Sequence, residues 1–243
     1  MKLSIILGAI GLSAIFAQTH AASFSRIEVN DPIVEGAACQ VDTAQTYGSY
    51  IFELPSRFDQ VFWPVTDERG LWFCETSGFV GINHDFDDLS DEEITQIRAY
   101  LAEHYRGDSS MLKKLRLLDA IYEMREKPDE FRVQLWRLLA WHYERMGDFT
   151  DARYYRQRAL IGMRSALNGE LDPRTRAEYL FVAATYEKEL GNPLTSDEMY
   201  RLLEASLVDV ELEGFGDYAN YLRRLVAEAA DIYPGGRLAP EYH

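Results

Sequence analysis

Two stretches in the C-terminal half of the chain decide the fold: residues 135–160, LWRLLAWHYERMGDFTDARYYRQRAL, and residues 178–207, EYLFVAATYEKELGNPLTSDEMYRLLEASL. In each stretch an aromatic residue, an alanine and a tyrosine recur along one helix, and a glycine then marks a turn. These residues are Trp136, Ala140, Tyr143 and Gly147 in the first stretch, and Tyr179, Ala183, Tyr186 and Gly191 in the second. The same order occurs twice, so the sequence predicts two successive helical hairpins.

This pattern resembles the tetratricopeptide repeat, a helix pair in which large and small residues alternate so that neighbouring pairs interlock. The resemblance implies that Ala140 and Ala152 allow close helix approach, while Trp136 and Tyr143 fill the volume between pairs. The two turn glycines lie 44 positions apart, which exceeds the repeat length of about 34 residues. We therefore expect a tetratricopeptide-like region with a long return helix rather than a regular array.

The chain is predicted to be helical from residue 89 onward. Ser90 and Glu93 have the spacing of a capping box at a helix start. Further helices are expected over residues 110–126, 129–146, 149–167, 174–190, 195–211 and 217–232. The helix over 131–146 is apolar on nearly every face, which is typical of a helix in the middle of a bundle. The helical domain thus covers 89–232, and the Pro/Gly-rich residues 233–243 are expected to form a flexible tail.

The part of the chain before residue 88 is rich in aromatic and β-branched residues separated by turn residues. Short strands are expected over residues 49–54, 61–65, 71–74 and 79–82. They predict a small antiparallel β module within residues 22–88. The fold class is therefore α+β, with this β module preceding the tetratricopeptide-like α-helical domain.

The first residues, MKLSIILGAIGLSAIFAQTHAASF, have the layout of a secretory signal peptide. Lys2 precedes an apolar run that is shorter than the ~20 residues of a spanning helix, and small residues follow it. We expect cleavage after Ala21, so that residues 1–21 are removed and the chain is periplasmic or secreted without stable membrane insertion. An uncleaved anchor is the alternative. The formal net charge of −15 repels phosphate backbones and argues against nucleic acid as a partner.

The chain contains two cysteines, Cys39 and Cys74, and each begins half of a zinc knuckle. In the sequences CQVD and CETS, Asp42 and Ser77 stand where a C-x-x-C turn has its second cysteine. In an oxidising compartment an even pair of cysteines indicates a disulfide first. The sequence alone does not prove that pairing.

The combination resembles a family of uncharacterised bacterial proteins in which a Cys-x-x-Cys zinc ribbon precedes tetratricopeptide-like helices. The matching residues after the second half-knuckle are Gly78–Phe79, Asp85–Phe86 and Leu89–Ser90–Asp91–Glu92–Glu93. The departures at Asp42 and Ser77 imply a degenerate ribbon in which the remaining thiols face each other. A Cys39–Cys74 disulfide would close a loop of about 35 residues and contribute roughly 3.5–4 kcal/mol in the chain-entropy model.

Three alternatives to the disulfide stay open. Cys39, Asp42, Cys74 and His84 could form a mixed metal site, a residual metal-binding ribbon. The two thiols could also be unpaired. A catalytic cysteine would need a neighbouring histidine to form the thiolate, and the local sequence supplies none.

The acidic stretch HDFDDLSDEE, residues 84–93, concentrates carboxylates, which are the groups that calcium binding or acid catalysis would use. An EF-hand loop would need an oxygen ligand at Leu89 and a glycine at Ser90, so the calcium pattern fails. Acidic residues at a helix start are favoured by the helix dipole. The chain lacks the common nucleophile, P-loop and dinucleotide motifs, so we expect no catalytic residue, metal or cofactor. A periplasmic hydrolase that uses acidic side chains is the alternative.

A non-enzymatic scaffold that binds a protein or peptide is the leading functional expectation. In tetratricopeptide proteins the first helix of each pair lines a concave groove, and the resemblance places Gln134, Arg137, Trp141 and Glu144 toward it. Arg137 and Trp141 are four residues apart and share a helix face. An exposed Trp beside an Arg is typical of an interface anchor. The alternative is that Trp141 belongs to the core.

Overall fold

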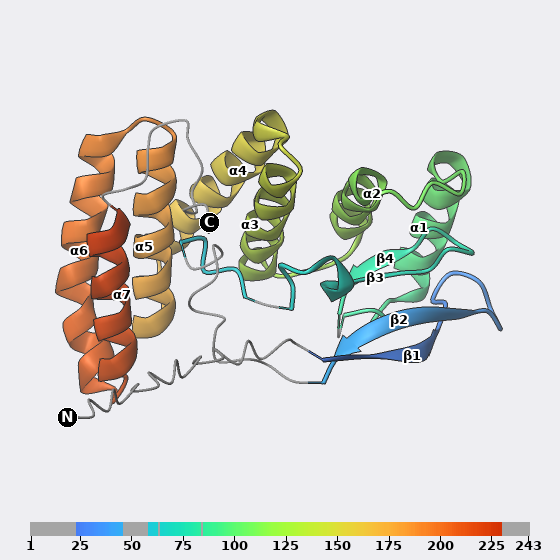
Figure 1. The fold of residues 1–243 in the computed structure, drawn as a ribbon, viewed down its shortest axis with the longest axis horizontal. Helices are drawn as coiled ribbons and strands as arrows, with labels where there is room; N and C mark the ends of the chain where they lie inside the picture. The colour runs from blue at the N-terminus through green and yellow to red at the C-terminus, as the bar shows by residue number, and fades with distance from the viewer. Residues whose placement is uncertain (1–22, 46–57, 63, 84, 230–243) are drawn as a thin grey trace, which may run out of the picture.

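The computed structural model describes residues 23–45, 58–62, 64–83 and 85–229, and it has an α+β fold (Figure 1). Within these residues, two small antiparallel sheets precede seven α-helices. The prediction of a small N-terminal antiparallel β region followed by helices is therefore confirmed. The expected signal peptide, the strand over 49–54 and the tail over 233–243 lie outside the described residues, and the division of the chain at residue 88 stays a prediction.

The first sheet pairs β1 (Phe24–Asn30) with β2 (Ala38–Ala44). The register sets Phe24 opposite Ala44 and Asn30 opposite Ala38. Residues 31–37 join the strands, and in this loop the Asp31 carboxylate accepts hydrogen bonds from two backbone amides. Neither strand was predicted from the sequence, although Ile27 and Val29 alternate with polar residues in β1.

The second sheet pairs β3 (Leu71–Phe73) with β4 (Val80–Ile82), close to the strands expected at 71–74 and 79–82. The strand expected over 61–65 is wrong, because these residues are not paired in a sheet among the described residues. Pro64 lies in this run and has no amide hydrogen to donate to a ladder.

Local signals define the helix boundaries. Helix α1 (Asp91–His104) begins with the predicted capping box: Ser90 accepts from the Glu93 amide, and the Glu93 carboxylate accepts from the Ser90 amide. Helix α2 (Met111–Met124) begins after Ser110, whose hydroxyl accepts from the Lys113 amide. These caps replace the missing intrahelical partners of the first turn.

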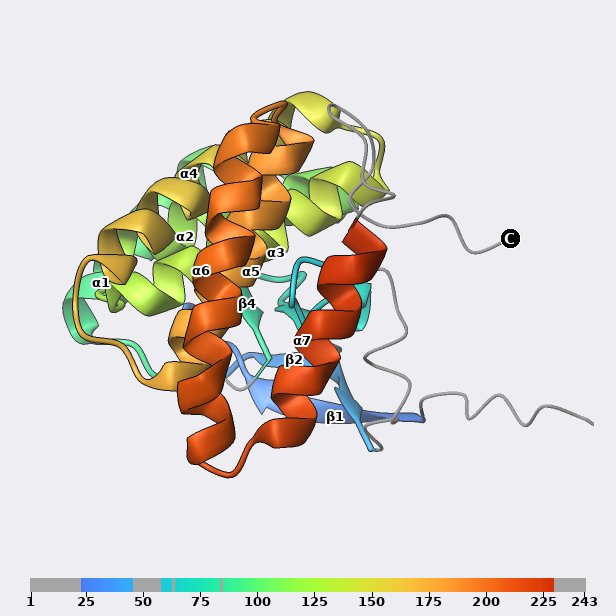
Figure 2. The same cartoon turned by 90° about the vertical axis from the view of Figure 1, so that its left-hand side faces the viewer.

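Helices α3 (Asp129–Arg145) and α4 (Phe149–Leu167) form one pair, and α5 (Pro173–Glu189) and α6 (Pro193–Leu212) form the next. Gly147 and Gly191 follow the first helix of each pair with φ values of +80° and +90°, a conformation that favours glycine. Helix α7 (Gly216–Glu228) packs against α6 (Figure 2). The predicted hairpins are therefore present.

The buried apolar residues form two clusters that meet at α3 and α4. The first cluster joins the two sheets to α1, α2, α3 and the start of α4, so the β region shares a core with helices. The second cluster joins α4 to α5, α6 and α7 and includes Phe58 from the segment before β3. Helix α3 is buried along most of its length, as its apolar faces predicted.

Candidate functional site

The face of α3 that was predicted to line an open groove is covered by the chain itself. Arg137 is 0% exposed and Trp141 is 7% exposed, so the expectation that this pair is exposed is wrong. Gln134 is exposed and Glu144 is half-buried. The covering residues are 58–62 and 64–66, which we call the groove segment; Figure 1 shows it beside α3.

Side chains of α3 hold the groove segment through its main-chain carbonyls. The Arg137 guanidinium donates to the carbonyl oxygen of Asp59 at 2.6 and 3.1 Å and to that of Gln60 at 2.8 Å. One turn further along the helix, the Trp141 indole donates to the Thr66 carbonyl at 3.4 Å. The next residue, His142, bonds the Val65 carbonyl at 3.0 Å. These contacts hold the main-chain carbonyls of a segment that itself forms turns at residues 58–60 and 64–66.

The groove segment also reaches α5 and α7. The Gln60 side-chain amide donates to the Tyr221 hydroxyl of α7 at 3.4 Å. The Asp59 carboxylate is fully buried and interacts with Tyr186 of α5 and Arg156 of α4. Gln60 has a φ of +51°, the one non-glycine residue with positive φ in the described part of the chain. Such strained backbone persists where the surroundings hold it in place, so the segment is fixed at several points.

Buried ion pairs connect the helices beneath the segment. Arg137 pairs with Glu178 of α5 at 2.8 Å. Arg156 pairs with Glu144 of α3 and, at 3.6 Å, with Glu189 of α5. Glu144, predicted to bind a partner, is thus engaged inside the molecule. Removing one member of such a buried pair costs more than the pair contributes, because the remaining charge stays desolvated.

Burial shifts two pKa values at this site in opposite ways. It raises the pKa of Asp59 from 3.8 to about 7, against the attraction of Arg156. It lowers the pKa of His142 from 6.5 to about 4, although the hydrogen bond to the Val65 carbonyl acts in the other direction. Both groups are therefore uncharged in the folded protein at mildly acidic pH.

These shifts predict an unusual pH dependence. Because of Asp59, the free energy of unfolding falls as pH rises from 3.8 to 7. Because of His142, it falls as pH falls from 6.5 to 4. Each effect amounts to at most about 1.4 kcal/mol per pH unit. The two effects oppose each other between pH 4 and 6.5. In the Asp59→Asn variant the His142 effect is left alone, so its free energy of unfolding should fall more steeply on acidification than that of the wild type. Urea unfolding at pH 7 and 5 measures this, with exposed Asp87→Asn as the control; equal slopes for Asp59→Asn and wild type would contradict the assignment.

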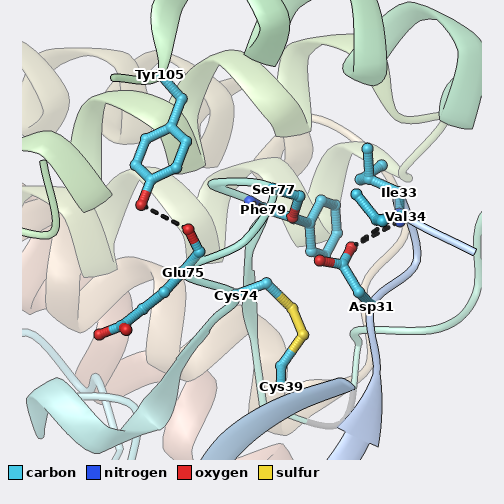
Figure 3. The surroundings of a disulfide bond; sticks show 9 residues. All are labelled: Asp31, Ile33, Val34, Cys39, Cys74, Glu75, Ser77, Phe79 and Tyr105. Carbon is cyan, nitrogen blue, oxygen red and sulfur yellow. Dashed lines mark hydrogen bonds between the residues drawn. A yellow bond between two sulfur atoms is a disulfide. The ribbon is translucent and has the colours of Figure 1, made fainter. Parts of the chain in front are cut away.

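The two cysteines lie at disulfide-bonding distance, with Cα atoms 5.0 Å apart (Figure 3). Cys39 lies in β2 and Cys74 directly follows β3, so the bond joins the two sheets. Gly78 closes the turn after Cys74 with a φ of +80°, and a Cβ there would overlap the Tyr105 ring. The disulfide prediction is therefore supported by the position of both thiols.

The half-knuckle positions do not contribute ligands beside the cysteines. The Asp42 carboxylate pairs with Arg26 at 3.4 Å, and the Ser77 hydroxyl accepts from the Phe79 amide at 3.1 Å. His84 lies outside the described residues. The metal site considered from the sequence, with Asp42 as a ligand, does not agree with this arrangement.

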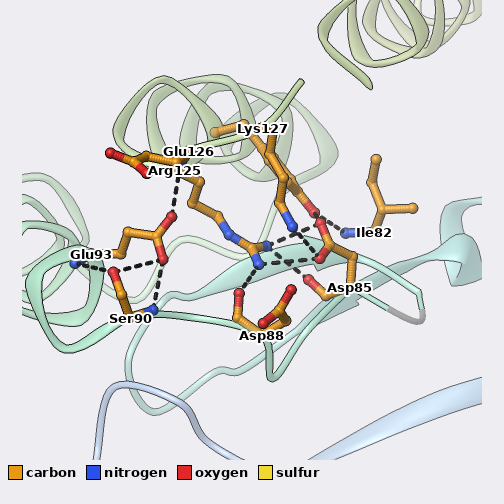
Figure 4. A network of polar contacts seen from close by, with 9 residues as sticks. Ile82, Asp85, Asp88, Ser90, Glu93, Arg125, Glu126 and Lys127 are labelled. Carbon is orange, nitrogen blue, oxygen red and sulfur yellow. Dashed lines mark hydrogen bonds and ion pairs between the residues drawn. The ribbon is translucent and has the colours of Figure 1, made fainter. Parts of the chain in front are cut away.

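The acidic stretch before α1 serves as a structural anchor (Figure 4). Asp85 pairs with Arg125 at 3.1 Å and with Lys127 at 2.7 Å, both at the end of α2. Arg125 also donates to the Asp88 carbonyl, and Glu93 accepts from the Glu126 amide at 2.8 Å. These bonds attach the segment between β4 and α1 to the α2–α3 connection.

A hydrolase that uses acidic side chains would need them in a pocket, and one pocket of about 610 Å³ is lined by Asp67, Glu68, Arg69, His142 and others. A general acid needs a raised pKa. Although burial raises the pKa of Asp67, hydrogen bonds from Arg69 bring it below the usual value. This arrangement does not provide a general acid.

Comparison with family models, curated proteins and solved structures gave no significant match. No helix in the described part of the chain is long and apolar enough to cross a membrane. The fold and the site together define an α+β protein in which the groove segment covers one face of α3. The sequence did not indicate this arrangement: residues 61–65 were predicted to form a strand, and no local pattern connected the groove segment to α3.

Proposed function

We propose that this protein is an exported, non-enzymatic interaction protein whose tetratricopeptide-like helices bind a peptide. The observation that carries the proposal is that Arg137, Trp141 and His142 form hydrogen bonds with main-chain carbonyls of the groove segment. Helix α3 therefore presents donors for main-chain carbonyls, and the groove segment represents the ligand. The cysteine pair and the leader-like first 21 residues support an oxidising compartment outside the cytoplasm.

The groove segment also indicates which peptides would fit. Phe58 is 2% exposed and Val61 is 3% exposed, and they flank a buried aspartate and a buried glutamine. A partner segment that replaces it would present an aromatic residue, an acidic residue and an aliphatic residue in a similar turn. Burying Phe58 and Val61 stabilises the closed form by about 1.5–3 kcal/mol each. A partner binds only open molecules, in which the groove segment has left α3. Because such molecules are a small fraction of the total, the partner's apparent affinity is reduced.

A synthetic peptide of residues 55–68 with a fluorescent label tests this function. We expect it to bind the Phe58→Ala/Val61→Ala protein at least about tenfold more tightly than wild type, because the weakened segment competes less. Fluorescence anisotropy measures the binding, and circular dichroism checks that the variant is folded. A peptide with Lys in place of Asp59 is the control and should bind weakly. Equal, weak binding of both peptides by the folded variant would contradict the proposal.

A further inference from the structure

The buried carboxylate of Asp31 lies beside the disulfide and is separate from the groove segment. A carboxylate oxygen of Asp31 and the two sulfurs of Cys39 and Cys74 lie within 4.8 Å of one another. The three residues are 5%, 4% and 0% exposed. Figure 3 shows Asp31 above the end of β1, next to the disulfide. Three potential metal ligands are thus gathered at one buried point.

The two oxygens of Asp31 have different surroundings. Oδ1 accepts hydrogen bonds from the Ile33 amide at 2.9 Å and the Val34 amide at 3.2 Å. Oδ2 is buried and has no hydrogen-bond partner. A buried oxygen without a hydrogen-bond partner destabilises the folded state. The neighbouring disulfide has no hydrogen-bond donor and so does not offset this cost. The backbone bonds orient the carboxylate, as outer-shell bonds orient metal ligands, and they leave Oδ2 free to accept a cation.

We propose that reduction of the Cys39–Cys74 disulfide creates a zinc site formed by the two thiolates and the Asp31 carboxylate. A phosphine reductant takes the oxygen of water to become the phosphine oxide, and the two sulfurs become thiols. Zn²⁺ then binds as both thiols release their protons, with Zn–S bonds of about 2.3 Å and a Zn–O bond of about 2.0–2.2 Å. Water fills the fourth position. Two thiolates favour zinc over calcium or magnesium.

This site shares the two cysteines of the zinc-ribbon pattern but differs from it in the third ligand, Asp31. Asp42 and Ser77, which occupy the second positions of the half-knuckles, bond elsewhere. Asp31 comes from the turn between β1 and β2, before either half-knuckle. Zinc bound here would join β2 to the residue after β3, the same two points that the disulfide joins. The two sheets would therefore be held together under both oxidising and reducing conditions.

Cobalt titration of the full chain tests the site. The protein is reduced with the phosphine, desalted without oxygen and titrated with Co²⁺. We expect a thiolate-to-cobalt charge-transfer band that saturates at one equivalent and disappears when Zn²⁺ is added. The oxidised protein should give no band. Asp31→Asn should weaken Co²⁺ binding at least about tenfold, whereas Asp42→Asn, the matched control in β2, should bind like wild type.

A second measurement separates a folded site from thiols in an unfolded chain. Zn²⁺ should raise the melting temperature of the reduced wild-type protein and of Asp42→Asn, but much less that of Asp31→Asn. Equal Co²⁺ affinity of wild type and Asp31→Asn would overturn the proposal, because unfolded thiols bind without Asp31. Absence of the charge-transfer band from reduced wild-type protein would overturn it as well.

Discussion

Replacing Arg137 with methionine is expected to lower the free energy of unfolding by about 3–5 kcal/mol. The guanidinium is fully buried and bonds the carbonyls of Asp59 and Gln60 as well as the carboxylate of Glu178. Methionine fills similar space but donates no hydrogen bond. The variant would leave two main-chain carbonyls and one carboxylate buried without this partner. Urea unfolding followed by circular dichroism measures the loss.

Arg145 provides the matched control for this prediction. It lies in the same helix and is exposed, with its guanidinium near the Trp141 ring. Arg145→Met is expected to change stability by only about 0.5 kcal/mol. Adding Glu178→Gln to Arg137→Met should recover part of the loss, because the two residues are coupled. If Arg137→Met lowered the free energy of unfolding as little as Arg145→Met, the Arg137 guanidinium would not hold the groove segment in place.

Replacing both cysteines with serine is the other change with a large expected effect. The disulfide closes a sequence separation of 35 residues, and the chain-entropy model assigns such a loop about 3.5–4 kcal/mol. The bond also lies in the first apolar cluster, where Cys74 is fully buried. We expect the double variant to unfold at clearly lower denaturant concentration than the oxidised wild type, with all samples in a metal chelator.

Chemical labelling provides the control for the cysteine prediction. The unreduced wild-type protein, unfolded in denaturant, should not react with an alkylating reagent, and it should take up two labels after reduction. Reduced wild type should have the stability of the serine variant. Two reactive thiols without reductant, or equal stability of the oxidised and serine forms, would contradict a stabilising disulfide.

The helices could be predicted from the sequence because their signals are local. The capping box of Ser90 and Glu93 and the glycines after α3 and α5 fix helix ends within a few neighbouring residues. The strands were harder to predict. The run at 61–65 has the composition of a strand but forms no sheet with described residues. The carbonyls of Phe62 and Pro64 accept turn hydrogen bonds, and the Val65 carbonyl bonds His142 of α3.

The site could be predicted only in part. Helical spacing placed Arg137 and Trp141 on one face of α3, and both do face the groove segment. Their burial could not be predicted from the helix, because Asp59 lies 78 residues earlier in the chain. Asp31 was missed as a neighbour of Cys74 for the same reason: the two residues are far apart in the sequence and meet only where the first sheet is joined to the second.

Cysteine labelling at two adjacent positions tests most directly whether the groove segment packs against the helices. Val61 is 3% exposed and Phe62 is 38% exposed. With the disulfide intact, the thiol of Val61→Cys should react with an alkylating reagent on the order of 100-fold more slowly than that of Phe62→Cys, because it reacts only when the segment opens. Equal rates in two folded variants would show that the segment does not lie in the groove.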